Sequence, residues 1–106
     1  MANGYVKWIS GRMEVWCNSA KTVSVTGKWG NTYISAKQTG YTYSAPFNVE
    51  PVVLMTMKGE GTDSGWIMAV DGGTEKVSPN YYIVRGDILN TQKEFNISVY
   101  AIGTWK

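Results

Sequence analysis

The chain has 106 residues and a mass of 11.7 kDa, the length of a single domain. It is 43% hydrophobic and 17% charged with a net charge of +2, so it can form a core and lacks the concentrated basic charge of most nucleic-acid-binding proteins. It contains no histidine and one cysteine, Cys17, which excludes histidine-based catalysis, histidine-ligated zinc and an internal disulfide. We therefore expect no metal and no cofactor.

The N-terminal residues show no targeting signal. Residues 1–5 have neither the basic start nor the apolar stretch of a signal peptide. No apolar run approaches the roughly 20 residues of a membrane-spanning helix. The sequence therefore predicts a soluble chain, or a soluble piece of a larger one, without membrane insertion.

Alternation of apolar and polar residues begins near the N-terminus and predicts a β-hairpin. Residues 5–9 and 12–17 flank Ser10-Gly11, a pair suited to a tight turn. In the second arm, Cys17 shares a face with Met13. We expect Cys17 to be a small buried hydrophobic residue.

Further strands are predicted through the middle of the chain. Residues 22–26 alternate and stop at Gly27, and residues 32–36 form a short strand after a turn over 27–31. Residues 37–48 lack strong alternation and predict a long connection. Residues 52–58 are apolar on both faces, which is typical of a central strand covered on both sides.

The second half continues with strands over residues 66–71, 81–85 and 94–102. The last has the clearest alternation, with one apolar face formed by Phe95, Ile97, Val99 and Ala101. No stretch of the chain has a helical period. The expected fold class is all-β, an antiparallel β-sandwich with an N-terminal β-hairpin. We expect one domain over 1–106, with the hairpin and short strands in 4–36 and the sandwich strands in 46–106.

Several segments resemble a known family. They are Phe47-Asn48-Val49-Glu50-Pro51-Val52-Val53, Tyr81-Tyr82-Ile83-Val84-Arg85, the closing Ala101-Ile102-Gly103-Thr104-Trp105-Lys106, and the glycine-turned hairpin of residues 4–16 that ends in tryptophan. Together they resemble the H-type lectin-like head domain at the C-terminus of bacteriophage tail fibres and baseplate receptor-binding proteins.

The resemblance implies an antiparallel sandwich of the six-stranded type that packs as a homotrimer. It also implies sugar-binding clefts near the subunit boundaries, recognition of a bacterial cell-surface saccharide, and a place in the virion, in a tail fibre or baseplate.

Saccharide binding requires flat aromatic faces and a few polar side chains. Trp29 lies in a turn of small and polar neighbours, so its ring is a candidate for sugar stacking; otherwise it covers a sheet edge or stacks on a subunit neighbour. Asp63 and Trp66 form a second candidate pair. The alternative has Asp63 shaping a turn and Trp66 in the core, and for Trp66 we favour the core.

Tyr81 and Arg85 form a third candidate group, because strand alternation places them on one face with Ile83. We expect this face to point outward and to contact a ligand or, more readily, a neighbouring subunit. The candidate carbohydrate-binding residues are therefore Trp29, Asp63, Trp66, Tyr81 and Arg85.

Three functions remain open. The first is a trimeric head that binds a bacterial surface glycan, and the second is a trimerising cap of a virion fibre that binds no ligand. The third is an OB-like barrel that binds single-stranded nucleic acid through aromatic residues, which the low positive charge disfavours. A glycosidase is disfavoured because no spacing pairs two carboxylates in a chain this small. We predict a binding protein, not an enzyme, with no nucleic acid partner.

Overall fold

A computed structural model describes residues 3–59 and 64–106. Within them the chain forms two four-stranded antiparallel sheets, which confirms the predicted all-β sandwich with an N-terminal hairpin. The strands are β1 (Gly4–Lys7), β2 (Arg12–Val25), β3 (Gly27–Trp29), β4 (Thr32–Ile34), β5 (Val52–Lys58), β6 (Trp66–Ala69), β7 (Tyr81–Arg85) and β8 (Leu89–Thr104).

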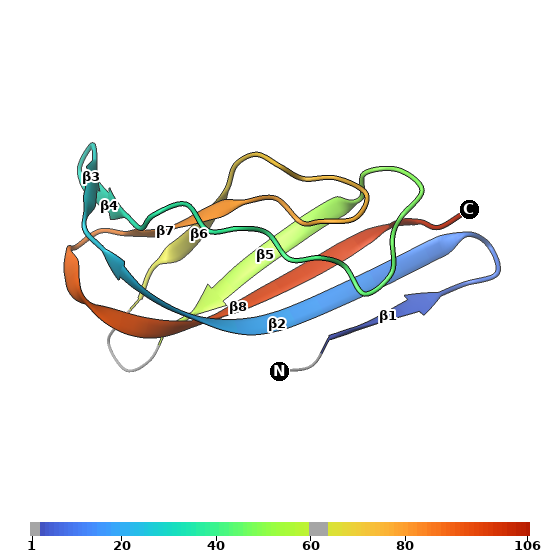
Figure 1. Cartoon of the computed structure of the whole chain (residues 1–106), viewed down its shortest axis with the longest axis horizontal. Coiled ribbons are helices and arrows are strands. Elements are labelled where there is room, and N and C mark those ends of the chain that lie inside the picture. Colours follow the sequence, from blue (N-terminus) through green and yellow to red (C-terminus); the bar gives the residue numbers. More distant parts are fainter. Residues whose placement is uncertain (1–2, 60–63) are drawn as a thin grey trace.

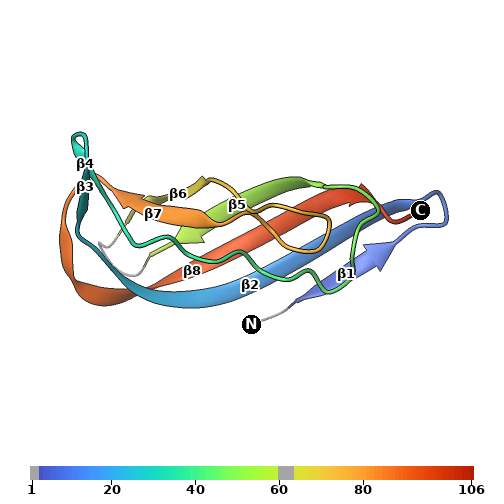
Figure 2. The same ribbon diagram turned by 45° about the horizontal axis from the view of Figure 1, so that its top comes forward.

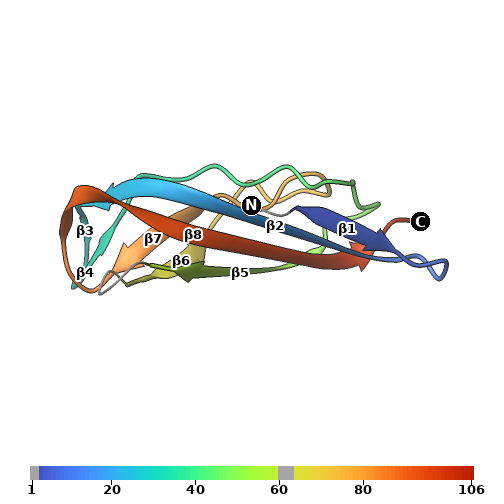
Figure 3. The ribbon, with the colours of Figure 1, turned by 90° about the horizontal axis from the view of Figure 1, so that it is seen from below.

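The two sheets give the molecule an elongated shape. Sheet A has the strand order β1-β2-β8-β5 and sheet B the order β3-β4-β7-β6 (Figure 1). The principal extents are 48 × 25 × 15 Å, with the β1–β2 hairpin at one end and β3 and β4 at the other (Figure 3). Side chains at the two ends therefore belong to separate surfaces.

The hairpin forms where the sequence predicts it. Gly11 adopts a left-handed φ of 104°, and its N–H donates to the Trp8 carbonyl at 3.0 Å, which closes the turn. The second arm is longer than expected, because most of the strand predicted over 22–26 belongs to β2, with a shift in register between Val23 and Val25. Pairing with β8 along this length, from Arg12 opposite Thr104 to Val25 opposite Leu89, satisfies the backbone across the polar middle of β2.

The core lies between the sheets and uses the apolar face predicted for β8. Val15 pairs with Ala101 and Cys17 with Val99, so alternate residues of both strands point inward. The buried residues that β2 and β8 of sheet A contribute to the core are Met13, Val15, Cys17, Val25, Leu89, Phe95, Ile97, Val99 and Ala101. The prediction that Cys17 is buried is confirmed, and its burial raises the pKa of the thiol.

Two expectations about strands are wrong. β5 is an edge strand and not a central one, because it pairs only with β8 and exposes Val52 and Leu54 by 71% and 59%. The predicted turn over residues 27–31 is itself largely a strand, since Gly27–Trp29 pairs with β4 and only Gly30 and Asn31 form the turn.

The predicted long connection between β4 and β5 is present and closes one side of the core. It runs beside β2 along the length of the sandwich (Figure 2). Its buried residues alternate, although it forms no regular strand; Tyr43 and Phe47 pack edge to face with ring centroids 5.3 Å apart. Backbone bonds to the β6–β7 connection hold it, including Tyr43 N–H to the Lys76 carbonyl at 2.8 Å.

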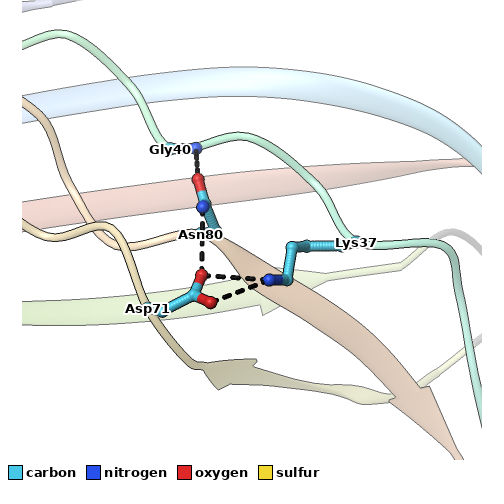
Figure 4. Close-up of polar contacts among 4 residues, drawn as sticks. All are labelled: Lys37, Gly40, Asp71 and Asn80. Carbon is cyan, nitrogen blue, oxygen red and sulfur yellow. Dashed lines mark hydrogen bonds and ion pairs between the residues drawn. The ribbon is translucent and has the colours of Figure 1, made fainter.

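A polar network anchors the start of this connection (Figure 4). Lys37 Nζ lies 2.8 and 3.1 Å from the Asp71 carboxylate oxygens, and Asn80 Nδ2 donates to Asp71 Oδ1 at 3.1 Å. The Gly40 N–H donates to Asn80 Oδ1 at 3.0 Å. The connection is thus tied to both sides of the β6–β7 turn.

The network predicts a local response to acid. The hydrogen bonds from Lys37 and Asn80 lower the pKa of Asp71 below its usual value. Because the Asp71 pKa is lower in the folded than in the unfolded state, the ionised carboxylate stabilises the network at pH values above its unfolded-state pKa. This stabilisation is lost as the pH falls through the folded-state pKa of Asp71. We expect the Gly40 amide to lose hydrogen-exchange protection in that range, after correction for intrinsic rates. The same pH profile in Asp71→Asn would contradict this assignment.

Candidate functional site

Two exposed tryptophans, Trp29 on β3 and Trp66 on β6, lie on the outward side of sheet B. Trp66 pairs with Val84, Val84 with Ile34, and Ile34 with Gly27, so these residues form one row across the sheet. Directly paired residues place their side chains on the same side. The next row to one side of it contains Met68 and Tyr82. Trp29 faces the same side of the sheet but lies beyond the opposite side of the Trp66 row, two residues from Gly27. We call Trp29, Ile34, Trp66, Met68 and Tyr82 the aromatic face.

The two tryptophans of the aromatic face are the most accessible of its members. Trp29 is 50% exposed and Trp66 49%, while Ile34, Met68 and Tyr82 are half-buried. Val84 lies in the middle of the row and is fully buried. The aromatic face therefore has a half-exposed indole at each of its two edge strands, β6 and β3.

The spacing of these indoles suits an extended ligand. β6 and β3 are separated by three strand spacings, about 14 Å, and Trp29 is displaced by two further residues, about 7 Å, so their Cα atoms lie roughly 15 Å apart. Aromatic rings offer flat apolar faces to which the C–H face of a sugar ring can stack.

The structure brings two of the predicted site residues together and corrects what was expected of a third. Trp29 and Trp66 share the aromatic face, and the expectation that Trp66 belongs to the core is wrong. Tyr81 and Ile83 do share a face, as predicted, but that face points inward and Tyr81 is fully buried. Tyr81 therefore cannot present its ring to a ligand or a subunit.

Tyr81 is part of a hydrogen-bonded and stacked group of side chains inside the sandwich. Its hydroxyl lies 3.0 Å from that of Tyr41, and the two rings stack with centroids 6.2 Å apart. Ser19 extends this chain of hydroxyls with a hydrogen bond to Tyr41. Burial raises the pKa of Tyr81, which keeps the phenol neutral.

Arg85 and Asp63 are the remaining candidates. Arg85 Nη1 donates to the Ser64 carbonyl at 2.7 Å and Nε to the Asp87 carbonyl at 3.3 Å, so its guanidinium holds two loop segments. Asp63 lies outside the described residues. The role of both in ligand binding stays a prediction.

Sequence reasoning missed Ile34, Met68 and Tyr82. Alternation does place Met68 with Trp66 and Tyr82 with Val84, and this signal was present in the sequence. The pairing of β6 with β7 and of β7 with β4, which joins them into one surface, could not be obtained from it.

The perturbed phenol and thiol groups of the core have a simple cause. Burial raises the pKa of Tyr43 to about 12, and its hydroxyl has no hydrogen-bond partner among the described residues. Among residues 3–59 and 64–106, no group of three or more histidine, cysteine, aspartate or glutamate side chains could hold a metal ion. The same residues contain no helix long and apolar enough to cross a membrane.

Comparison with known proteins identifies a fold neighbour. No family model matches the chain, and no curated protein matches it. Among solved structures, the P. aeruginosa R1 pyocin fibre comprising C-terminal residues 323–701 is similar, with a TM-score of 0.57 and 15% identity over 97% of this chain. This chain spans 28% of that fibre fragment. The chain therefore has a tail-fibre-like β fold.

Proposed function

We propose that this chain is a receptor-binding domain of a tail fibre and recognises a bacterial cell-surface saccharide as a homotrimer. One observation carries the proposal: two half-exposed tryptophans lie on one face of a fibre-like β-sandwich. Exposed aromatic rings that gather on one face are typical of binding sites, and sugar rings can stack on them. The resemblance to H-type lectin-like heads agrees with this function and with a place in the virion.

A second surface supports the homotrimer. On the outward side of sheet A, Trp16, Tyr100 and Leu54 form one row, and Ile102 and Val52 extend it. We call these five residues the outer stripe. Leu54 and Val52 are its most exposed members, and exposed apolar residues gathered on one face are a common feature of protein interfaces. Identical copies arranged about one axis would each cover the outer stripe of a neighbour.

We expect light scattering on a sizing column to give three times 11.7 kDa, about 35 kDa, at all concentrations tested. Leu54→Glu, which places a charge in the outer stripe, should yield monomers. Val49→Glu is the matched control, because Val49 is equally exposed at 59% but lies outside the stripe. A wild-type monomer at every concentration would exclude the homotrimer.

We expect the fluorescently labelled protein to bind a subset of bacterial strains saturably, and purified surface polysaccharide from those strains to compete. Binding should change little from about 50 mM to about 500 mM salt, whereas binding to single-stranded nucleic acid would weaken steeply. A trimer that binds no strain would favour the ligand-free fibre cap. If the protein instead retains single-stranded nucleic acid with strong salt dependence, the hypothesis of an OB-like nucleic-acid-binding barrel is favoured.

A further inference from the structure

A pocket opens beside the aromatic face, where β2 passes into β3. It has a volume of about 430 Å³, within the usual range for small-molecule sites. We call it the polar pocket, and its polar lining consists of Thr22, Ser24, Thr26, Ser35, Gln38 and Gln92. None of the residues predicted from the sequence as sugar contacts lines it.

The side chains that line the polar pocket are uncharged. Its polar groups are four hydroxyls and two amides, and no acidic or basic side chain lines it. Gln38 and Gln92 are the only two glutamines of the chain, and they come from different segments. A phosphate or carboxylate entering this pocket would lose water without gaining a cation. Hydroxyls and side-chain amides instead match the hydroxyl groups of a neutral sugar, which both donate and accept.

Part of this lining is held in place, and part is free to bind. Ser35 Oγ accepts the Ile83 N–H at 3.0 Å, and Gln38 Nε2 donates to the Ala36 carbonyl at 2.8 Å. In the described part of the chain, the side chains of Thr22, Ser24, Thr26 and Gln92 make no hydrogen bond to another protein group. A ligand can therefore use them without breaking an internal bond.

The position of the polar pocket connects it with the aromatic face. The row that starts at Trp66 continues through Ile34 to Gly27, and both Ile34 and Gly27 also line the pocket. The pocket lining thus lies two to three strand spacings, or about 10–14 Å, from the Trp66 backbone. A single extended chain of sugar residues could reach both.

We propose that the polar pocket binds one sugar residue of an uncharged saccharide whose neighbouring residues stack on the aromatic face. This inference rests on the proposed function and adds to it the substrate class, a neutral glycan, and the groups that hydrogen-bond its hydroxyls. Stacking supplies apolar contact, and the pocket selects against charged sugars.

The test uses the full chain and an array of neutral, uronate-bearing and sialylated oligosaccharides. We expect the bound members to be neutral, and the side-chain amide signals of Gln38 and Gln92 to shift in NMR spectra on titration with a bound member.

A triple variant tests the lining residues. Its substitutions Thr22→Val and Thr26→Val keep the side-chain shape and strand preference but remove two hydroxyls, and Gln92→Leu removes an amide. Because the triple variant lacks three hydrogen-bonding groups, we expect it to bind roughly tenfold or more weakly. Thr91→Val is the control, since Thr91 is exposed and does not line the pocket.

The outcomes separate the two proposals. Suppose that the wild type binds neutral oligosaccharides, that Trp66→Ala binds them more weakly, and that the triple variant binds them as the wild type does. The pocket inference then fails and the proposed function stands. A preference for acidic oligosaccharides also overturns the inference alone. If the wild type binds no member of the array and no bacterial strain, the proposed function fails and the inference with it.

Discussion

Replacing both tryptophans of the aromatic face, in Trp29→Ala with Trp66→Ala, is expected to weaken binding to bacterial cells about a hundredfold while the protein stays folded. Each indole is about half exposed, so its removal takes little from the core. Aromatic anchors at binding sites typically contribute 1–2 kcal/mol or more when truncated. We expect roughly tenfold weaker binding for each single variant and roughly a hundredfold for the pair, provided that the two sites are independent.

The measurement is cell or polysaccharide binding by interferometry, with circular dichroism and the thermal midpoint as folding controls. Trp8→Ala is the matched variant, because Trp8 is 40% exposed but belongs to the β1–β2 hairpin at the far end of the molecule. Its binding should equal that of the wild type. Equal loss in Trp8→Ala, or full binding by the double variant, would remove the aromatic face as the site.

Gly40→Ala is expected to be strongly destabilising. A Cβ at this position would lie 1.9 Å from the Ser78 carbonyl oxygen and 2.9 Å from that of Pro79, and both are backbone atoms. Relief of this overlap requires the connection to move away from the β6–β7 turn, which would strain the bond from Gly40 N–H to Asn80. We expect a loss of about 3 kcal/mol or more in the free energy of unfolding. That corresponds to a fall of at least about 12 °C in the thermal midpoint of a chain of this length.

Gly86→Ala is the control for this substitution. Nothing lies within 4 Å of a Cβ built there, and Gly86 does not have a positive φ. Its midpoint should match the wild type within a few degrees. Both variants should be compared at one protein concentration, because oligomers unfold in a concentration-dependent manner. A stable Gly40→Ala protein would show that the connection does not pack closely against residues 78 and 79.

The sequence was informative where one face of a strand is apolar and the other polar. Residues 94–102 show this contrast, and the predicted inward face of β8 is the observed core. The turn at Ser10-Gly11 was likewise predictable, since a glycine is needed for its left-handed backbone. Contrast between faces and special backbone geometry are local properties, and they can be inferred without knowing the neighbours.

Prediction failed where both faces of a strand are apolar. Residues 81–85 carry large side chains on each side, so alternation showed that Tyr81 and Ile83 lie together but not which side they occupy. The same ambiguity led to a central position for residues 52–58 and to a core position for Trp66. In each case, which side of the strand is buried depends on which strands pair with it and which segments cover it.

The sequence by itself determined the all-β class, the N-terminal hairpin, the inward face of the last strand and the chemical types available for binding. Only the tertiary structure decided that β5 is an edge, that Trp29 and Trp66 share one surface, and that the two glutamines line one pocket. The physical reason is that a strand's period is set by its own residues. Its neighbours, its register and its solvent-facing side are set by contacts between segments far apart in the chain.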